Sequence, residues 1–439
     1  FDTTILGSNP SAPAKKMKKK LSKNNLLKKI QAILFPFYKS KELTRIFKKL
    51  EKDQPKNKNI AMFVGGCVRK YILNEEIDDI DIATIFSPAE IKIKFNEDDQ
   101  VKVLETGVEH GTVTLMINNK KFEITTLRKD VNTDGRHAEV EYTDDWEKDS
   151  ERRDFTINAI YLDINGKIFD PQMGTTDLKN NNVKFIGDPQ KRIEEDFLRI
   201  IRFVRFKIMY NSKVEPIISK AIKFNLNGIK KISKERILIE LLKILNLKNF
   251  INLNENTHLK EIFSLIFPEF SNINRLERLK MICNHSLINP NILLPVLLID
   301  EKDNHEYFSH KYNVSNSVKE NLNLFAKNLK LLSGNKDFFN KDLEKNIYLY
   351  NKEHLINLNI LNFVNNTKCK LKDFSETMSR ILQSKEHEFT IDGKFLMQNG
   401  MKEGLTLGRV LNIIEKEWMN NDFRISKNRI REIIKSNSN

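Results

Sequence analysis

Two aspartates separated by one residue, Asp79 and Asp81, stand in an apolar run of strand length. Alternate side chains of a strand point to the same face, so both carboxylates are expected on one side while Ile80 and Ile82 point to the core. Proteins usually hold Mg²⁺ with a few carboxylates together with substrate phosphates. Two such ions can activate an attacking hydroxyl and neutralise a departing pyrophosphate. The pair therefore predicts a catalytic magnesium site for phosphoryl chemistry.

Glu123 is the candidate for a third carboxylate beside this pair. It lies in the strand-like run of residues 121–127, in an otherwise apolar pattern. A neighbouring strand could bring its side chain next to Asp79 and Asp81, which makes it a candidate catalytic residue. A solvated position on an edge strand explains the same residue equally well.

Paired glycines, Gly65 and Gly66, end one strand-like run and open a short helical pattern that contains Arg69. Glycines let the backbone approach a phosphate closely, and the N–H groups and dipole of a helix start favour an anion. Arg69, one turn into the helix, could share that anion. The segment predicts a phosphate-binding turn, although an ordinary strand-to-helix turn could have the same sequence.

Arg152 and Arg153 precede Asp154 directly before another apolar run. Taken alone, this triplet suits a surface ion pair. Its place at the inner edge of the predicted domain makes phosphate or ribose hydroxyl groups plausible partners, since guanidinium groups bind such oxygens well.

Residues 195–206 carry the most informative pattern. Steps of three residues drift slowly around a helix, so a continuous helix would place Asp196, Arg199, Arg202 and Arg205 in one slanting stripe. The other positions are almost all apolar, which predicts a buried helix whose stripe faces something polar. Clustered arginines repel one another unless a bound anion or an acidic side chain neutralises their charge. The alternative is a basic helix paired with acids elsewhere in the chain.

Asp196 and Arg199 could also read a base. Cytosine and adenine each present an exocyclic amino donor beside a ring-nitrogen acceptor, which a carboxylate and a guanidinium complement. Uracil and guanine show the reverse pattern, and an unpaired buried polar group costs ~1–3 kcal/mol. One Asp–Arg pair could therefore select C and A without a nucleic-acid template.

The elements that must position these residues fall into two regions. Short strand-like runs, a short helix at 67–73 and a hairpin around Asn118-Asn119 occupy residues 60–185, while from about residue 190 apolar residues recur at helical spacing. This predicts an α+β chain with a small mixed β-sheet followed by helices. The predicted strands are 61–64, 80–85, 112–117, 121–127, 159–162 and 167–169.

Composition narrows the class of protein. A net charge of +15 and a pI near 9.4 favour binding of a polyanion such as nucleic acid, although a lysine-rich composition from an AT-rich genome would give the same charge. The longest apolar run, residues 292–299, is far shorter than the ~20 residues of a membrane span. Cys67, Cys283 and Cys369 match no zinc or redox spacing, which indicates a reducing compartment.

Together these residues resemble the class II tRNA nucleotidyltransferase and bacterial poly(A) polymerase family. The resemblance is clearest over residues 45–250, and the 300–385 region carries no readable chemistry. The matching segments are VGGCVRK (64–70), DIDIAT (79–84), GRHAEVEYTDDWEKDSERRDFTINAI (135–160), DPQMGTTDL (170–178), EEDFLRIIRFVRF (194–206), SKERILIELLKIL (233–245) and FTIDGKFLMQNGMKEGLTLGRVLNIIEKEW (389–418).

The resemblance implies roles for individual residues of the head. Gly66 and Arg69 match the triphosphate-binding turn of the family. Asp79 and Asp81 match its ligands for Mg²⁺, with two ions expected. Arg153 matches the arginine that contacts the nucleotide.

Further along the chain, Asp196 and Arg199 match the family's amino-acid template for base choice, with Arg202 and Arg205 as nearby nucleotide-binding arginines. The resemblance also places a flexible loop, implicated in switching from C to A addition, near residues 129–150.

Two more matches concern structure rather than chemistry. Ser233, Glu235 and Arg236 match a structural motif of the neck helices. Lys70 departs from the family, which usually has Asp directly after the arginine of the turn; this puts triphosphate binding only slightly in doubt.

The implied domains are a basic extension (1–40, of which 1–16 need not be native), a nucleotidyltransferase head (41–185), a neck with the nucleotide-selecting helix (186–250), a helical body (251–385) and an RNA-contacting tail (386–439). The expected substrates are tRNA, CTP and ATP, with no membrane, no obligate protein partner, and a cytoplasmic rather than mitochondrial location. The leading expectation is CCA addition. Poly(A) polymerase, a CC-only or A-only enzyme, and a tRNA-binding protein with a dead head are the alternatives.

Overall fold

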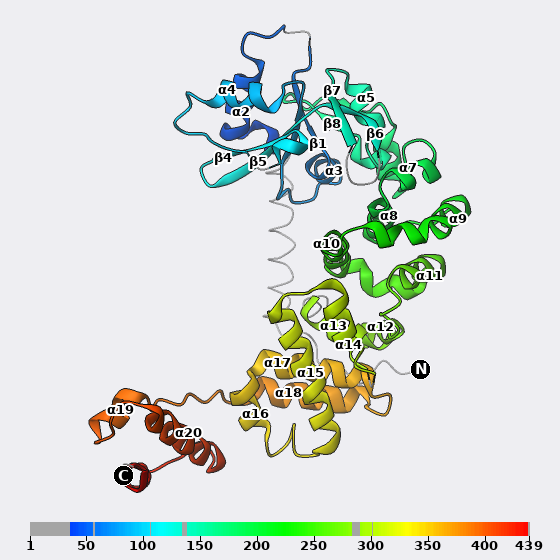
Figure 1. The fold of residues 1–439 in the computed structure, drawn as a ribbon. Helices are drawn as coiled ribbons and strands as arrows, with labels where there is room; N and C mark the ends of the chain where they lie inside the picture. The colour runs from blue at the N-terminus through cyan, green and yellow to red at the C-terminus, as the bar shows by residue number, and fades with distance from the viewer. Residues whose placement is uncertain are drawn as a thin grey trace, which may run out of the picture. The chain divides into compact units, whose positions relative to one another are not determined.

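A computed structural model describes residues 36–55, 58–105, 107–133, 138–282, 290–300 and 302–437 (Figure 1). The chain divides into two compact units, Phe1–Asn249 with Asn256–Ile266, and Phe250–Glu255 with Phe267–Asn439. Most of the predicted N-terminal extension and Cys283 lie outside the described residues. Among the helices described, none is long and apolar enough to cross a membrane.

A seven-stranded mixed sheet forms the centre of the first unit, in the order β3-β4-β5-β2-β1-β8-β9. Strand β1 is buried throughout and pairs antiparallel with β2 and β8, whereas β2 pairs parallel with β5. The strands are β1 (Ala61–Val64), β2 (Asp81–Thr84), β3 (Lys102–Leu104), β4 (Thr112–Ile117), β5 (Lys120–Thr126), β8 (Tyr161–Leu162) and β9 (Ile168–Phe169).

Helix α2 (Lys41–Glu51) supports β1 through an apolar stripe. Its buried residues recur at helical spacing, and Phe47 packs on Phe63 of β1 with 4.8 Å between ring centroids. The Ser40 hydroxyl accepts a hydrogen bond from the Leu43 N–H and so begins the helix. Helix α2 also contacts α4 (Pro88–Phe95), and α3 (Gly66–Ile72) follows directly from β1.

The hairpin predicted at Asn118-Asn119 is confirmed. Both residues have positive φ, 50° and 62°, between β4 and β5. A two-residue turn of this kind needs positive φ at both positions, which asparagine tolerates better than most residues. The turn fixes the register that places Glu123 opposite Thr114 on β4.

Strands β1 and β4 have the predicted bounds, but other strands differ. Strand β2 begins at Asp81, so Asp79 lies outside the strand and the two carboxylates are not placed by one strand alone. The 159–162 run is a strand only at Tyr161–Leu162, after a 3₁₀ turn at Thr156–Asn158. Strand β3 was not predicted, because three residues give too short a pattern.

The expected flexible loop of residues 129–150 is partly regular. Strands β6 (Arg128–Thr133) and β7 (Ala138–Tyr142) pair as a two-stranded sheet, and α5 (Trp146–Glu151) follows. Residues 134–137 lie outside the described part of the chain. Pairing with a neighbouring strand supplies order that the charged local sequence does not reveal.

The predicted continuous helix over residues 195–206 is wrong at its start. Helix α7 (Pro189–Glu195) ends before Asp196, whose backbone is extended at φ −151° and ψ 106°, and α8 runs over Leu198–Met209. The Asp196 carboxylate accepts a hydrogen bond from the Leu198 N–H at 3.0 Å. Such local side-chain bonds compete with helix formation. Asp196 is therefore not part of the predicted stripe, whereas Arg199, Arg202 and Arg205 all lie on α8.

Helix α8 is largely buried, as predicted, and packs against α10 and α11. Its fully buried Lys207 donates hydrogen bonds to the Lys213 carbonyl and to Glu215, which fixes the turn into α9. The remaining helices of this unit are α6 (Gly174–Lys179), α9 (Pro216–Asn225), α10 (Lys234–Leu245) and α11 (Thr257–Ile266).

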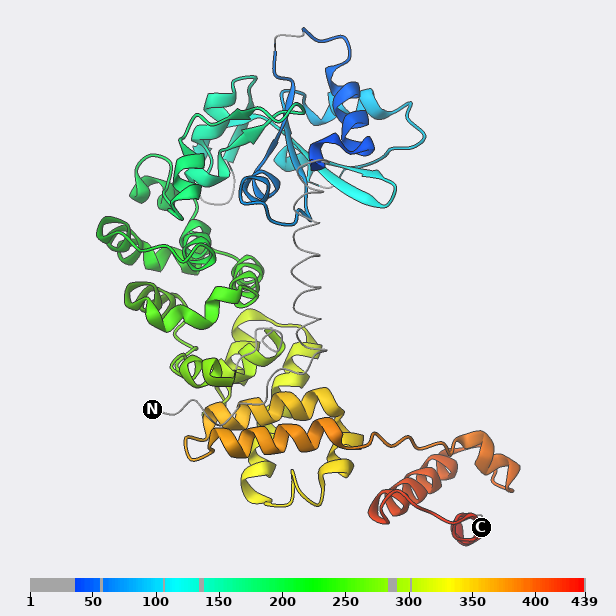
Figure 2. The same cartoon turned by 180° about the vertical axis from the view of Figure 1, so that it is seen from behind.

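The second unit is helical in its described residues. Figures 1 and 2 show α17 (Lys352–Asn365) and α18 (Leu371–Gln383) side by side, and α17 also contacts α12, α13, α15 and α16. The other helices are α12 (Arg275–Ile282), α13 (Pro290–Leu298), α14 (Asn304–Tyr312), α15 (Asn316–Gly334), α16 (Leu343–Tyr350), α19 (Gly393–Gln398), α20 (Leu405–Asn420) and α21 (Lys427–Asn437). The last three share a core of their own that includes Leu396, Val410 and Ile433.

Candidate active site

A polar cleft of about 640 Å³ in the first unit gathers almost all of the predicted site residues. Basic side chains outnumber acidic ones around it, which favours an anionic ligand. Of the predicted residues, Glu123 alone is not part of the lining. The lining residues are Gly65, Gly66, Arg69, Lys70, Asp78, Asp79, Asp81, Arg128, Arg152, Arg153, Asp154, Asn158, Asp196, Arg199, Arg202, Arg205, Phe206 and Lys243.

Asp81 stands at the start of β2, where strand pairing places it opposite both Val64 and Glu123. Burial, together with the charge of Glu123, raises the pKa of Asp81 to about 6 although Arg153 acts against the shift. None of the described residues donates a hydrogen bond to its carboxylate. Carboxylate oxygens of this kind have the donor chemistry that fits Mg²⁺.

Asp79 and Glu123 relate differently to Asp81. Asp79 precedes β2 and is exposed at the cleft, whereas Glu123 is an exposed residue of the adjacent strand β5. Within the described residues, no three acidic, histidine or cysteine side chains form a group that could hold a metal. The side chains present thus offer Asp79 and Asp81, with further ligands left to substrate, as is usual for Mg²⁺.

The turn between β1 and α3 requires glycine at its first position. Gly65 has φ 75°, and a Cβ atom there would lie 3.3 Å from Oδ2 of Asp81. At Gly66, which has ordinary helical φ, a Cβ atom would meet no atom of the protein within 4 Å. The cleft is therefore open directly over the backbone at the start of α3.

Arg69 is oriented by residues from other elements. Its Nε donates to the Tyr210 hydroxyl at 3.1 Å, its Nη1 donates to the Asn158 side chain, and its guanidinium lies 5.0 Å from the ring centre of Phe206. Two of these partners belong to the same element: Phe206 lies on helix α8, and Tyr210 lies directly after its C-terminal end. The turn and the helix are thus joined at the side chain predicted to bind phosphate.

Arg153 is held by Asp149, a residue that sequence reasoning missed. Arg153 Nη2 lies 2.9 Å from Asp149 Oδ2, and Nε donates to the Tyr161 hydroxyl at 3.0 Å. Burial opposes ionisation of Asp149, but the charges of Arg153 and Arg152 outweigh it and hold the pKa of Asp149 well below its usual range. An acid four residues before Arg153 on α5 was the available signal.

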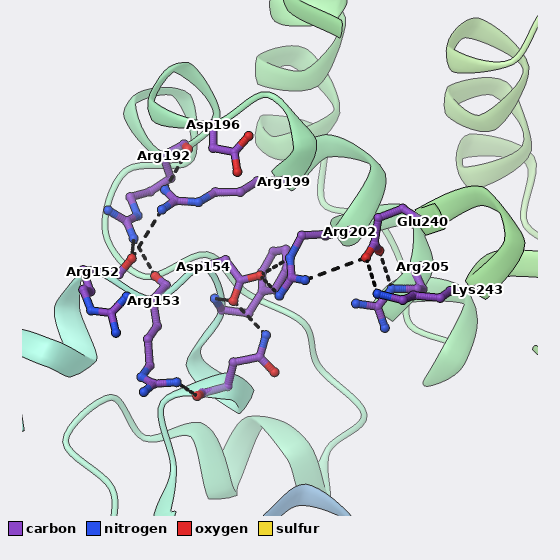
Figure 3. A network of polar contacts seen from close by, with 12 residues as sticks. Arg152, Arg153, Asp154, Arg192, Asp196, Arg199, Arg202, Arg205, Glu240 and Lys243 are labelled. Carbon is purple, nitrogen blue, oxygen red and sulfur yellow. Dashed lines mark hydrogen bonds and ion pairs between the residues drawn. The ribbon is translucent and has the colours of Figure 1, made fainter. Parts of the chain in front are cut away.

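Each arginine of α8 has an acidic partner, and Figure 3 shows those of Arg202 and Arg205. Arg202 pairs with Asp154 at 2.7 Å and Arg205 pairs with Glu240 of α10 at 2.7 Å. Burial opposes the charge of Asp154, but Arg202 outweighs it and lowers the pKa of Asp154 to about 2. The arginines of α8 therefore form ion pairs with acidic residues of the chain itself, and they also line the cleft.

Asp196 and Arg199 both line the cleft but do not pair with each other. Asp196 Oδ2 lies 2.9 Å from Nη2 of Arg236 on α10. Arg199 Nη1 contacts Glu195 at 2.5 Å and the Arg192 carbonyl at 2.9 Å. Sequence reasoning assigned Arg236 only to a structural motif and missed it as the partner of Asp196.

Comparisons with known proteins agree with this geometry. Residues 61–184 match the family model described as "Poly A polymerase head domain", and residues 213–273 match "Probable RNA and SrmB- binding site of polymerase A". The chain is 30% identical over 401 residues to "CCA tRNA nucleotidyltransferase 1, mitochondrial" of Danio rerio, covering 85% of this chain and 87% of the relative. It is also 30% identical over 372 residues to the "CCA-adding enzyme" of Lactobacillus helveticus, covering 81% and 88%.

The chain belongs to the class II CCA-adding enzyme family. The crystal structure of the Bacillus stearothermophilus CCA-adding enzyme in complex with CTP superposes with a TM-score of 0.66 at 25% identity, covering 89% of this chain and 95% of that one. The predicted family and the predicted fold class, a head with a mixed sheet followed by helices, are thus confirmed.

Lys70, which the sequence analysis noted as a departure from the resemblance, lies in the cleft of this CCA-adding enzyme family member. Lys70 forms an ion pair with Asp78, which also lines the cleft. The hydrogen bond from Lys70 lowers the pKa of Asp78. Sequence reasoning did not single out Asp78, nor the lining residues Arg128, Asn158, Phe206 and Lys243, because each belongs to the site only through the folding of distant segments.

Proposed function

We propose that this chain is a tRNA CCA-adding enzyme, which adds C, C and A in turn to the 3′ end of tRNA from CTP and ATP and releases pyrophosphate. The observation that carries the proposal is the cleft, which is lined both by a carboxylate pair and by an arginine cluster from α8. This arrangement suits a nucleoside triphosphate, whose phosphates need cations and whose base needs directional hydrogen bonds. Membership of the family supplies the tRNA substrate.

For the metal site we propose Asp79 and Asp81 as ligands of Mg²⁺, with Glu123 as a third catalytic carboxylate. When bound, Mg²⁺ would activate the 3′-hydroxyl of the RNA and neutralise charge on the pyrophosphate. Asp81 fits this role because its buried charge has no hydrogen-bond donor among the described residues. Glu123 raises the local negative charge from the neighbouring strand.

For the triphosphate we propose the turn at Gly65 and Gly66, with Arg69 and Arg153. The open space over Gly66 allows phosphate oxygens to approach backbone N–H groups. Arg69 and Arg153 are each held by neighbouring side chains, so little conformational entropy is lost when they bind an anion. Preorganised cations of this kind stabilise developing charge in the transition state.

For base selection we propose Asp196 and Arg199. A carboxylate oxygen that accepts one hydrogen bond from Arg236 retains lone pairs for an exocyclic amino group. Arg199 uses Nη1 for Glu195, which leaves donors for a ring nitrogen. We propose that Asp154, Arg202 and Arg205 complete the nucleotide-binding wall.

Poly(A) addition and CC-only or A-only addition use the same kind of site and remain the alternative functions. The test is incubation with tRNA lacking its 3′ CCA, Mg²⁺ and each labelled nucleotide in turn. CCA addition predicts two C residues and one A, then a stop. A long A ladder on any RNA identifies a poly(A) polymerase, and no incorporation identifies a tRNA-binding protein.

We further propose the domain bounds 41–185, 186–250, 251–385 and 386–439 for head, neck, body and tail, with RNA contacts in the tail. For the location we propose the bacterial cytoplasm, with mitochondria as the alternative that the Danio rerio relative suggests. Separate expression of residues 386–439 with measurement of tRNA binding tests the tail, and a fluorescent fusion of the chain tests the location.

A further inference from the structure

Asp79 is held by a segment without regular structure. Residues 75–80 form neither helix nor strand, and β2 begins only at Asp81. Asp81 is fixed by strand pairing on both sides, whereas Asp79 has no ladder partner. The nearest sheet contact is that of Ile80, whose carbonyl accepts a hydrogen bond from the Glu123 N–H at 3.2 Å. The position of the Asp79 backbone therefore depends on contacts outside the sheet.

A single oxygen of Asp78 links this segment to helix α3. Oδ1 of Asp78 forms the ion pair with Lys70 and also accepts a hydrogen bond from the Asp79 N–H at 2.9 Å. The Lys70 carbonyl accepts a second hydrogen bond from the Glu75 N–H at 2.8 Å, which ties the start of the segment to the end of the same helix. Lys70 thus contacts the segment at two points, Glu75 and Asp78.

We propose that Lys70 is a positioning residue, which holds Asp79 at the metal site through Asp78. The proposal rests on the proposed function only for the role of Asp79. The ion pair supplies the link, because the positive Lys70 side chain of α3 faces the negative side chain of Asp78.

The Lys70–Asp78 ion pair is expected to affect catalysis more than folding stability. The side chains of Lys70 and Asp78 are 31% and 67% exposed, and such ion pairs stabilise a fold by only ~0–1 kcal/mol. A displacement of about 1 Å at a reacting centre can nevertheless reduce the rate ~100-fold. Loss of the pair should therefore leave the fold intact and impair metal binding.

Charge alone makes the opposite prediction. Replacing Lys70 by Asp adds negative charge close to Asp79, which by itself would attract a divalent cation. In this chain the new carboxylate would repel Asp78 and displace the segment. Weaker metal binding in Lys70→Asp would thus indicate positioning, whereas tighter binding would indicate a purely electrostatic role.

The experiment compares the full-length wild type with Lys70→Asp, Asp78→Lys, the double variant and Lys70→Arg. Mn²⁺ binding is measured by electron paramagnetic resonance in the presence of CTP and without RNA, alongside the Mg²⁺ dependence of CCA addition and the melting temperature. Lys58→Asp is the matched control, because Lys58 forms an exposed ion pair with Asp144 at 2.7 Å and does not line the cleft.

We expect each single charge reversal to weaken Mn²⁺ binding and to raise the half-saturating Mg²⁺ concentration by roughly tenfold. Lys70→Arg should keep both values within about twofold of wild type, and Lys58→Asp should change neither. The double variant should stay impaired, because a lysine at position 78 offers no acceptor to the Asp79 N–H. A Lys70→Arg variant as impaired as Lys70→Asp, or full recovery in the double variant, would overturn the proposal. So would a higher KM for CTP with unchanged Mn²⁺ binding, which would place Lys70 on the triphosphate.

Failure of the proposed function has a different signature. If the wild type adds no nucleotide to tRNA but the Mn²⁺ measurements follow the expected pattern, the positioning role stands and the proposed reaction is wrong.

Discussion

Asp196 and Arg236 form an ion pair of 2.9 Å although 40 residues separate them along the chain. Asp196 lies in the break between α7 and α8, and Arg236 lies in the first turn of α10. The pair therefore connects the proposed base-selecting carboxylate to a helix that carries no proposed contact with the base. It suggests that base selection depends on neck packing as well as on Asp196 itself.

Replacement of Asp196 by Ala should relax nucleotide choice while some transfer remains. Loss of the acceptor for the exocyclic amino group removes about 1–3 kcal/mol of discrimination, roughly 5- to 150-fold in the preference for CTP over UTP. The measurement is the ratio of kcat/KM for the two nucleotides. Asp188→Ala is the control, because Asp188 caps α7 outside the cleft. Unchanged preference in Asp196→Ala would contradict the proposed reading of the base.

Replacement of Arg236 by Ala should have a smaller effect in the same direction. The Arg236 side chain is 40% exposed, so we expect a contribution of about 0.5–1 kcal/mol, or a two- to fivefold loss of preference. In the double variant with Asp196→Ala, the Arg236 change should add almost nothing, since the two residues act through one contact. Full additivity would show that Arg236 acts elsewhere.

Replacement of Gly66 by Ala tests the phosphate-binding turn. The new Cβ atom meets no protein atom within 4 Å, so the melting temperature should not fall. The methyl group would, however, stand where a phosphate must approach the backbone, and we expect KM for CTP and ATP to rise roughly tenfold, which corresponds to about 1.4 kcal/mol. Gly408→Ala is the matched control, because Gly408 lies on α20 and its Cβ also has open space. Unchanged KM values would remove this turn from the proposed triphosphate site.

Asp98 provides a pH test that does not involve the cleft. Hydrogen bonds from Arg45 lower the pKa of Asp98 to about 2, below the unfolded value near 3.9, despite the opposing effect of burial. A lowered folded-state pKa stabilises the fold above the unfolded pKa, and this stability is lost as pH falls from about 4 towards 2. Asp98→Asn should reduce the free energy of unfolding at pH 7 by about 1 kcal/mol and so lower the melting temperature. The difference in melting temperature between the variant and the wild type should shrink below pH 4.

The control for this prediction is Asp144→Asn, which removes an exposed ion pair with Lys58. It should change the melting temperature much less at pH 7. An Asp98→Asn difference that stays constant between pH 7 and pH 3 would show that its effect is not electrostatic.

Several parts of the fold could be predicted because their signals are local. The buried strand β1 is a run of four apolar residues, and the Asn118-Asn119 turn needs only the tolerance of asparagine for positive φ. The amphipathic pattern of α8 and α10 likewise follows from spacing within one helix. In these cases the free energy that selects the structure comes from neighbouring residues.

Other features could not be predicted because two distant segments create them. The position of Asp79 outside β2 depends on where pairing with β1 and β5 begins. The break at Asp196 depends on a carboxylate that bonds locally to Leu198 and at long range to Arg236. The acid partners of Arg202 and Arg205 come from residues 154 and 240, which no spacing rule connects.

The sequence by itself determined which chemical groups the site contains and on which local elements most of them lie. These are a carboxylate pair near β2, a glycine turn before α3, and arginines along α8. Tertiary structure alone decided their protonation, orientation and partners. The half-buried Asp81 has a raised pKa because the sheet removes it from water and places Glu123 beside it. Burial and long-range ion pairs are properties of the folded chain, so the spacing of residues cannot contain them.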